Sequence, residues 1–557
     1  MSKVENLDPA LRFLVALSAK IATLGILAKR FSSSIAVDQK NDVEDPTDHA
    51  ALASEQHVAS ILAAETVASS SAWLGRVCRH HGVDILALPD DVQPGPFAND
   101  VDPASHFDIA FELVLASIGL TEAPQGATTG SVDSEKKGKE KERKEAMVYS
   151  ALDRTLVVRT ASGLGVSLKT VEDAEKSIAQ FLYFQLSEEE GGPKADGGSN
   201  GWDEAAQEEK EKAAKKGKML KWAATGAGFV LGGVAIGLTG GLAAPALAPF
   251  LVGGLGIAAF SGAGGAILIG TLLGLGGGGL AGYRAHSRLK GLEELAFEQL
   301  KKPDVPSIPS LTATICCSGF LLDLEDSVSP WRPSFEKSNL DTFALKVDTA
   351  TFLSAGRSLD KYLRNKVLQM GGQEILKTTA LSALYAGVAL PLAIFSGAST
   401  VLDSDFSRCR DKARKAGILL AEILEKKVQG SRPVILVGYG PGATIIFEAL
   451  LELHRRELGS LVYIAILISL PSSPNAVKWA SARSVVSNRL VNCHSTNDWV
   501  LAIAARLYTL SASVAGMQPV SAEGVENVDC SDLVTGHLEL RGKITEILER
   551  VKAQGSV

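Results

Sequence analysis

Residues 437–442, VGYGPG, have the pattern of a turn that presents a catalytic side chain. They follow the apolar run 433–436 and precede residues 443–450, which have helical character. A strand, a glycine-rich turn and a helix in this order form the elbow that exposes the nucleophilic serine of a G-x-S-x-G motif. Position 440 is glycine, so the sequence predicts the elbow without its nucleophile.

Asp498 and His537 have the order and spacing of the two partners of such a serine. Asp498 follows a predicted strand over 489–493, and His537 follows another over 525–528. An acid and then a histidine, each in a loop after a strand, is the chain order of this catalytic arrangement. Two structural alternatives stay open: Asp498 could cap a helix that begins at 499, and His537 could be an ordinary surface histidine near a helix start.

The strands and helices predicted around these residues indicate an α/β fold with an α/β-hydrolase-like parallel sheet. From residue 310 onward, short β-rich apolar runs alternate with helical ones, which is typical of a sheet covered by helices. The predicted strands are 311–316, 342–347, 433–437, 461–469, 489–493 and 525–528. The predicted helices are 349–365, 405–427, 443–457, 499–508 and 539–552.

The stretch 222–283 contains no charged residue and accounts for the positive mean hydropathy of the chain. A membrane span needs about 20 apolar residues, so this stretch could supply two crossings with a turn near Pro245 and Pro249. Glycines recur at four-residue spacing, as in Gly270, Gly274 and Gly278, and such ridges let two helices pack closely in lipid. The alternatives are a buried glycine-rich hairpin inside a soluble domain and a loop. A second uncharged stretch, 378–402, could be a buried helix or a third membrane contact.

Changes in composition divide the chain into six predicted parts. The N-terminus has charged residues within its apolar stretch, which favours an amphipathic helix over a secretory signal. Residues 134–145 mix both charge signs without apolar anchors, which is typical of a solvated linker. The parts are an N-terminal helical region (1–130), a charged linker (131–145), a helical segment (146–186), a flexible polar linker (187–218), a glycine-rich transmembrane hairpin (219–285) and the α/β-hydrolase-like domain (286–557).

Composition also limits the partners of the protein. The net charge of -7 over 557 residues gives no basic field, so nucleic acid is excluded as an expected partner. The six cysteines have no metal-ligand spacing and predict reduced thiols in cytosol-facing domains. No motif predicts a cofactor or a metal. Cationic residues on both flanks of the hairpin place its two ends on the cytoplasmic side. We therefore expect a protein held in or tightly on an endomembrane, such as Golgi or endosome, with membrane lipid as a partner.

Several long motifs resemble one known family and occur in the same order. They are KMLKWAATGAGFVLGGVAIGLTGGLAAPALAP, GLAGYRAHSRLKGLEELAF, RPVILVGYGPGATIIFEALLEL, NRLVNCHSTNDWVLAIAARLYTLSASVAGMQPV and GVENVDCSDLVTGHLEL. The chain from about residue 146 to 552 is similar to the transmembrane and coiled-coil domain-containing protein 4 family, also described as domain of unknown function 726. The resemblance implies a membrane-associated α/β-hydrolase domain with serine-hydrolase or lipase-like activity.

The resemblance assigns roles to individual positions, and this sequence departs from the family at one of them. The family's elbow is usually G-[FY]-S-L-G, so Gly438 and Gly442 are its glycines and Gly440 stands where the serine belongs. The aspartate of a DW motif falls on Asp498, and the histidine of a GHL motif falls on His537. Gly319 lies in the turn that builds part of the oxyanion hole in such folds.

The departure removes two parts of the expected chemistry. In dissected triads, loss of the serine alone lowers turnover on the order of a millionfold. The residue after the nucleophile normally donates its N–H to the oxyanion, but Pro441 has none, and one lost donor costs roughly a hundredfold to a thousandfold. Thr444 and Ser318 are nearby hydroxyls without the exposed position of an elbow residue. Glycines around Pro441 can still form the sharp turn.

Three functions remain in competition at this point. The first is a membrane-associated pseudo-hydrolase that binds a lipid or a protein in the old cleft. The second is an active esterase or lipase in which Asp498 and His537 activate water. The third is a trafficking scaffold whose N-terminal helices recruit cytosolic proteins.

Overall fold

The computed structural model describes most of the sheet and of the N-terminal helices. It describes residues 7–31, 46–90, 97–122, 145–189, 230–231, 234–235, 263–275, 279–283, 291–300, 309–335, 338, 340–369, 400–498, 514–534 and 540–554. His537, the predicted helix 499–508, the linker residues 131–144 and 190–218, and most of the uncharged stretches 222–283 and 378–402 lie outside the described residues.

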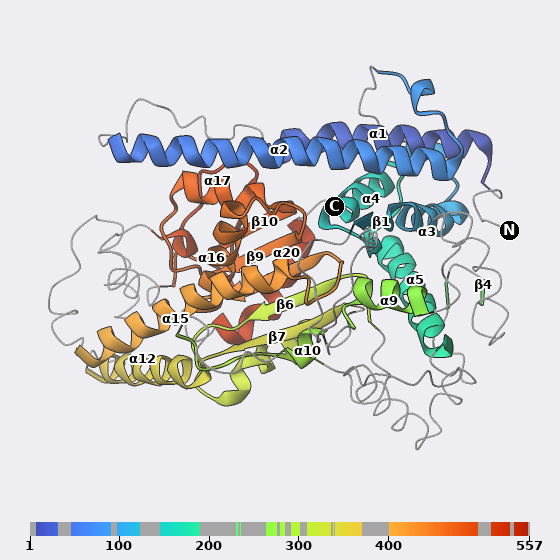
Figure 1. The fold of residues 1–557 in the computed structure, drawn as a ribbon. Helices are drawn as coiled ribbons and strands as arrows, with labels where there is room; N and C mark the ends of the chain where they lie inside the picture. Colours follow the sequence, from blue (N-terminus) through green and yellow to red (C-terminus); the bar gives the residue numbers. More distant parts are fainter. Residues whose placement is uncertain are drawn as a thin grey trace, which may run out of the picture.

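A seven-stranded sheet forms the centre of the protein (Figure 1). The strand order is β11-β10-β9-β8-β6-β7-β5, and neighbouring strands are parallel except for β5, which pairs antiparallel with β7. This confirms the predicted α/β fold. The strands are β5 (Leu295–Gln299), β6 (Ala313–Cys317), β7 (Asp341–Val347), β8 (Val434–Tyr439), β9 (Val462–Ile468), β10 (Val486–His494) and β11 (Val525–Asp529).

The elbow strand lies in the middle of the sheet, where both faces are covered. β8 pairs with β6 on one side and β9 on the other, so its side chains are buried in alternation on the two faces. Leu436 lies in the apolar cluster under α16, whereas Val437 lies in the cluster under α20. The six predicted strands are confirmed. β5 was missed because LAFEQ is a short edge strand with mixed polarity.

Helices cover both faces of this sheet. One face carries α12 (Thr349–Gln369), α15 (Thr400–Glu425), α16 (Pro441–Arg455) and α17 (Ala476–Ser484), and the other carries α20 (Ile544–Gln554) and α11 (Arg332–Phe335). α15 and α16 make extensive contact with each other, and α16 packs on β6, β8 and β9. The predicted helices over 349–365, 405–427, 443–457 and 539–552 are confirmed, with small shifts in their bounds.

The N-terminal helices form a second apolar cluster beside the sheet. They are α1 (Pro9–Phe31), α2 (Pro46–His81), α3 (His106–Ser117), α4 (Ala151–Gly163) and α5 (Leu168–Glu189), with the hairpin of β1 (Gly119–Glu122) and β2 (Glu145–Val148). Short elements are η2 (Ile85–Ala87), η3 (Ala98–Asp100), η4 (Pro103–Ser105), α10 (Gly279–Gly282), η6 (Leu324–Ser327), η7 (Ser329–Trp331), η8 (Ala515–Met517), η9 (Arg541–Lys543), β3 (Val230–Leu231) and β4 (Val234–Ala235).

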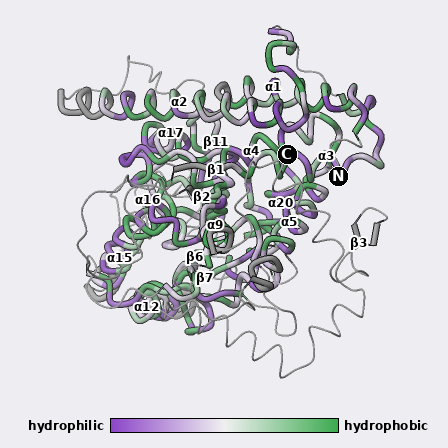
Figure 2. Tube along the Cα trace, turned by 45° about the vertical axis from the view of Figure 1, so that its right-hand side comes forward, coloured by the Kyte–Doolittle hydropathy of each residue, from purple (hydrophilic) through white to green (hydrophobic). Residues whose placement is uncertain are grey.

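α2 joins the two clusters. This helix has 36 residues and is therefore about 54 Å long, and it runs across the top of the molecule above α17 (Figure 1). Near its C-terminal end Trp73 is buried among the N-terminal helices, whereas Leu62 is buried in the cluster of the sheet. Hydrophobic and hydrophilic segments alternate along α1 and α2 (Figure 2), as expected for helices with one buried face.

A buried ion pair connects the N-terminal helices to the sheet. Arg154 on α4 donates to both carboxylate oxygens of Glu175 on α5, at 2.8 and 2.9 Å. The Tyr149 hydroxyl donates to the same carboxylate at 2.8 Å. The guanidinium also stacks over the ring of Tyr463 on β9, 4.3 Å from its centroid. The helical segment 146–186 is thereby packed directly on the sheet.

Residues 263–273, near the C-terminal end of the uncharged stretch 222–283, pack on α5 and β2. α9 (Ala263–Leu273) has 11 residues and contacts α5 and β2, with Leu268, Ile269 and Leu272 buried. Gly274 follows with a φ of +69° and ends the helix, so α9 does not continue from Gly270 through Gly274. A Cβ at Gly274 would lie 2.4 Å from the carbonyl oxygen of Gln429, which explains the glycine as a close-packing residue.

One helix among the described residues is long and apolar enough to cross a membrane by length and composition. It is the window Pro9–Ile26 within α1, of which 33% is buried inside the protein. Val15, Ala19 and Ile26 on this helix are fully or almost fully buried with the other N-terminal helices. α1 therefore also has the properties of an amphipathic helix packed on a globular body.

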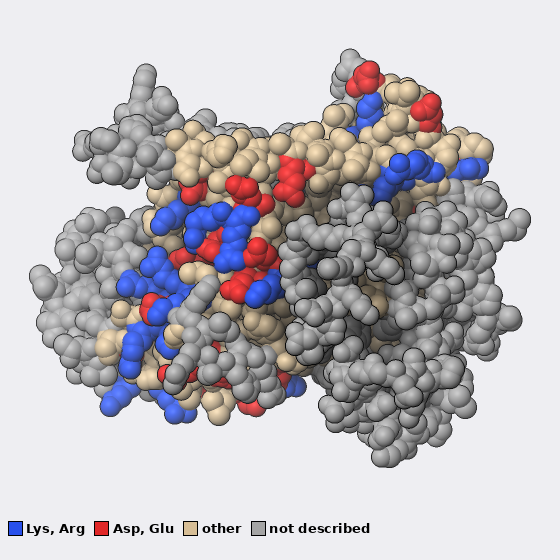
Figure 3. Space-filling view, viewed as in Figure 1, with Lys and Arg blue, Asp and Glu red and all other residues tan. Residues whose placement is uncertain are grey.

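Charged residues of both signs are interleaved on the face seen in Figure 3. Arg414 on α15 pairs with Glu448 on α16 at 3.0 Å, and Lys426 pairs with Glu422 at 2.7 Å. Such mixed surface pairs are typical of a solvated helix face.

Candidate functional site

Gly440 forms a sharp turn between β8 and α16. Its φ is +53° and its ψ is -127°, a conformation that glycine adopts without the steric penalty that a side chain brings. The Gly440 N–H donates to the carbonyl of Ile468 at 2.9 Å, and the Gly440 carbonyl accepts from the Thr444 N–H at 3.2 Å. The predicted strand, turn and helix are therefore present, and the turn is fixed to the neighbouring strand.

The glycines around Gly440 are required by close packing. A Cβ on Gly442 would lie 2.0 Å from the Cys317 carbonyl oxygen, and one on Gly438 would lie 2.8 Å from the backbone of Gly442. A Cβ on Gly319 would lie 2.7 Å from the ring of Tyr439. All three distances are shorter than any real Cβ contact, so these positions exclude larger residues. The sequence pattern at 319, 438 and 442 thus has a structural cause.

Gly440 itself has room for a side chain. A Cβ at this position would meet only the Cα of Gly319, at 3.9 Å, among its described neighbours. Packing therefore does not exclude a serine here. The described residues therefore leave space at position 440 that a side chain could occupy.

The two nearby hydroxyls are buried. The Ser318 hydroxyl donates to the Ser327 carbonyl at 3.0 Å and accepts from Trp331 Nε1 at 2.9 Å. Its proton is therefore held by a backbone carbonyl. Thr444 lies in the first turn of α16 and is 8% exposed.

Asp498 is fully buried in the loop that follows β10. Its N–H donates to the Ser495 carbonyl at 3.3 Å, which closes a turn at the C-terminal end of the strand. Residues from 499 onward lie outside the described residues, so the helix-capping alternative for Asp498 stays open.

The loop of Asp498 is bonded to the loop that leads toward His537. Ser495 Oγ donates to the Val534 carbonyl at 3.2 Å, and Asn497 Nδ2 donates to the Ser531 carbonyl at 2.7 Å. The Thr496 N–H donates to Ser531 Oγ at 3.0 Å. His537 itself is outside the described residues, three positions after Val534 in the sequence. The structure therefore joins the two loops and leaves the pairing of Asp498 with His537 a prediction.

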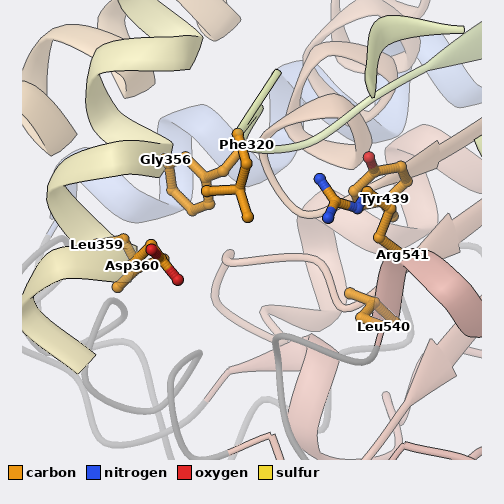
Figure 4. A pocket seen from close by; sticks show the side chains of 8 residues that line it. Phe320, Gly356, Leu359, Asp360, Tyr439, Leu540 and Arg541 are labelled. Atoms are coloured by element: carbon orange, nitrogen blue, oxygen red, sulfur yellow. The ribbon is translucent and has the colours of Figure 1, made fainter. Parts of the chain in front are cut away.

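A small pocket lies beside the elbow (Figure 4). It encloses about 40 Å³ and contains Tyr439, the residue before Gly440, together with Phe320 from the loop after β6. Its lining residues are Phe320, Leu322, Gly356, Leu359, Asp360, Tyr439, Leu540 and Arg541. Leu540 and Arg541 lie at the start of the described C-terminal segment 540–554, so the pocket brings together the elbow and the beginning of this segment.

Three polar residues of this pocket were not found from the sequence. Burial raises the pKa of the Tyr439 phenol to about 12, so this hydroxyl stays protonated at neutral pH. Arg541 Nη1 donates to Asp326 Oδ2, and Asp360 lies across the pocket from Arg541 (Figure 4). Only Tyr439 carried a signal, because it belongs to the elbow motif. The chain positions of Arg541 and Asp360 gave no hint that they share a pocket.

All six cysteines are free and buried, as expected from their spacing. Burial raises the pKa of the Cys316 and Cys409 thiols, so they remain neutral and chemically inert in the core.

Comparisons with known proteins place these observations in a family context. The family model "Protein of unknown function (DUF726)" matches residues 216–554. The chain is 32% identical over 367 residues to the "Transmembrane and coiled-coil domain-containing protein STS1" of Oryza sativa subsp. japonica, covering 62% of this chain and 55% of the rice protein. It is 32% identical over 420 residues to the "Uncharacterized membrane protein C6F6.13c" of Schizosaccharomyces pombe, covering 72% of this chain and 68% of that protein.

A further relative has a name that refers to an activity. The chain is 26% identical over 436 residues to the "Probable lipase MIL1" of Saccharomyces cerevisiae, covering 73% of this chain and 37% of the yeast protein. The chain thus spans little more than a third of that relative and about half of the rice protein. No solved structure matches this chain. Because the family model covers more than half of the chain, the chain belongs to the DUF726 family, whose members similar to it include named membrane proteins and one called a probable lipase.

Proposed function

We propose that this protein is a catalytically impaired pseudo-hydrolase that binds a lipid in the cleft beside Gly440 without hydrolysing it. The observation that carries the proposal is a complete elbow with glycine at the nucleophile position. The backbone turn, the packing glycines and the covered central strand are kept, whereas the hydroxyl is missing. A histidine that deprotonates a nucleophile has no side chain to act on at position 440.

The second loss occurs at the same reacting centre. Pro441 is the first residue of α16 and has no N–H to stabilise an oxyanion. Loss of the nucleophile and of this donor both raise the free energy of the same tetrahedral intermediate. We infer that the cleft retains the capacity to bind an acyl group and has lost the capacity to cleave it.

The test is a fluorophosphonate probe applied to the purified full-length protein. The expected result is no covalent labelling at concentrations that label an active serine hydrolase in the same tube. Robust labelling that disappears in His537→Ala would overturn the proposal, because it would require a working nucleophile and base. Retention of a bound acyl lipid, detected by mass spectrometry after native purification, is the positive result that we expect.

The alternative with support of its own is an esterase in which Asp498 and His537 activate water. Its support is the set of hydrogen bonds between the loop of Asp498 and the loop before His537. Ester turnover across acyl lengths separates this alternative from the first. It requires activity in the wild type and loss of that activity in both Asp498→Asn and His537→Ala.

Membrane attachment belongs to the same proposal. We propose that the uncharged part of 219–285 holds the protein on an endomembrane with the sheet and the N-terminal helices facing the cytosol. The cationic residues on both flanks and the free cysteines support this orientation. The N-terminal helices are then available to cytosolic protein partners.

A further inference from the structure

The amino ends and the carboxyl ends of the parallel strands have different neighbours. At the amino ends, the Tyr149 N–H donates to the carbonyl of Ser431, just before β8, at 2.9 Å, and the Ser431 N–H donates to the Thr271 carbonyl of α9 at 3.0 Å. Gly440 follows the carboxyl end of β8, whose six residues span about 20 Å. The elbow therefore lies on the side of the sheet that is away from α9 and the N-terminal helices.

α12 and α15 belong to the elbow side. α12 begins directly after β7, and its Ser354 and Ser358 hydroxyls donate to Asp405, near the start of α15, at 3.3 and 2.8 Å. Asp360 of α12 lines the same pocket as Tyr439. Figure 1 shows the end of α12 and the start of α15 at the lower left, whereas α5 and α9 lie at the right. The chain between α12 and α15 therefore leaves and re-enters the described part of the protein on the elbow side.

The sequence around these two helices favours a lipid surface as the partner on this side. The run 378–402 has no charged residue and exceeds the length of about 20 residues that a membrane segment needs. Residues 357–415, which include this run, contain ten cationic and five acidic residues, although the whole chain has a net charge of -7. Cations on both sides of an apolar run are typical of membrane proteins, and they attract anionic headgroups.

The described surface beside the pocket offers an apolar side chain next to cations. Leu324 in η6 is 59% exposed, and Arg357 and Lys361 on α12 are exposed as well. Arg357 Nε donates to the Leu322 carbonyl at 3.4 Å, which holds α12 next to the loop that carries Leu324. Proteins that bind at the surface of an anionic bilayer combine apolar side chains with cations in this way.

We propose that the elbow side docks on an anionic lipid bilayer other than the one that holds residues 222–262, through Leu324, Arg357 and Lys361. The inference rests on the proposed membrane attachment and adds the direction in which the cleft faces. Asp323 and Glu325 flank Leu324 and oppose the anionic lipid, so the docking is reversible. The protein then connects two bilayers, and the cleft beside Gly440 receives its lipid from the bilayer that it faces.

The test uses the full-length protein reconstituted in small fluorescent vesicles of phosphatidylcholine. Heavy sucrose-loaded vesicles, with equal parts of phosphatidylcholine and phosphatidylserine, are added at rising concentration, and the fluorescence that sediments with them is measured. The small vesicles are expected to sediment only when they carry the protein. Leu324→Ser and Lys361→Gln should each weaken this binding by about fivefold, because each removes one apolar contact or one cation at the surface.

Two matched controls lie among the N-terminal helices. Leu86→Ser replaces a leucine of η2 that is 88% exposed, and Lys169→Gln replaces an exposed lysine of α5. Both should leave the binding unchanged, and all four variants should keep the melting temperature because the four side chains are exposed. Protein that is retained on the small vesicles and does not sediment with the heavy ones would overturn this inference alone, as would equal weakening by the controls. Protein that is not retained on the small vesicles would overturn the proposed membrane attachment, and this inference with it.

Discussion

Gly440 and Gly319 face each other across the elbow, and a Cβ built on Gly440 would lie 3.9 Å from the Cα of Gly319. This ordinary van der Waals separation means that none of the described residues would clash with a Cβ at position 440. The backbone conformation of Gly440, with φ +53° and ψ -127°, would still penalise a serine by about 1–3 kcal/mol. We therefore expect Gly440→Ser to fold, with a modestly lower melting temperature.

Restoring the nucleophile should restore reactivity only when the oxyanion donor is restored as well. Gly440→Ser alone is expected to react slowly with a fluorophosphonate probe, because Pro441 provides no N–H. Gly440→Ser/Pro441→Leu should react about a hundredfold faster or more. The further change His537→Ala should abolish labelling. A folded double variant that does not label would show that the remaining partners are not assembled.

Gly442 should not tolerate even the smallest side chain. The Cβ of Gly442→Ala would lie 2.0 Å from the Cys317 carbonyl oxygen, so α16 would have to move away from β6. Overpacking of this kind typically costs about 1–3 kcal/mol of unfolding free energy. Gly75→Ala is the matched control, because nothing lies within 4 Å of its Cβ in the interior of α2. Urea denaturation should show the control stabilised by about 0.5–1 kcal/mol, and a fully stable Gly442→Ala would contradict the packing account.

The attachment of α2 to the sheet domain should depend on pH. Glu55 on α2 lies 2.8 Å from Nε2 of His454, and it accepts from Ser481 Oγ at 2.5 Å. The Ser484 hydroxyl donates to the Ser481 carbonyl at 2.7 Å, and its oxygen lies 2.7 Å from His454 Nδ1. The hydrogen bond from His454 lowers the pKa of Glu55 below its ordinary value of 4.5.

A carboxylate whose pKa is lower in the folded than in the unfolded protein stabilises the fold at pH values above its unfolded pKa. This stabilisation is lost as the pH falls through its folded pKa. Wild type should therefore exceed Glu55→Gln in unfolding free energy at pH 7, by about 1 kcal/mol or less because Glu55 is partly exposed. The difference should shrink as the pH falls below the ordinary value of 4.5. Urea titrations from pH 3.5 to pH 7 would measure it. A constant difference over this range would indicate that the Glu55 carboxylate contributes through packing alone.

Breaking the buried Arg154–Glu175 pair should destabilise the protein more than removing it entirely. Arg154→Met leaves a carboxylate that is 5% exposed without its cation, at an expected cost of about 3–5 kcal/mol. Arg154→Met/Glu175→Leu should recover most of this loss, since no buried charge remains. The comparison requires the unfolding free energy of both variants by chemical denaturation. Equal destabilisation in the single and double variants would argue that Arg154 acts mainly through its stacking on Tyr463.

Membrane attachment should depend on the part of the uncharged stretch that precedes α9. Deletion of residues 222–262 leaves Leu268, Ile269 and Leu272 in place, and these side chains belong to the core of the N-terminal cluster. The full-length protein is expected in the pellet after carbonate extraction, and the deletion variant in the supernatant. Release of the full-length chain by carbonate would contradict membrane insertion. Glycosylation of an acceptor site engineered in either flank would contradict the proposed orientation.

The sequence by itself determined the order of strands and helices in the part of the chain that forms the seven-stranded sheet. Apolar runs of four to nine residues alternate with helical periodicity from 310 onward, and these local patterns are set by the period of each element. The elbow was also visible, because a glycine-rich turn between a strand and a helix is a contiguous motif. β5 and α17 escaped detection, since neither has a strong apolar period of its own.

The tertiary structure decided which distant residues share a site. Arg541 and Tyr439 line one pocket because the fold brings η9, just before α20, next to the end of β8, and no local pattern in the sequence predicts that contact. The same holds for Glu55 and His454, which are separated by nearly 400 residues and meet only because α2 lies across α16 and α17. The periodicity of a helix or strand depends on residues that are neighbours in the sequence. Contacts between elements depend on how the whole chain buries its apolar surface.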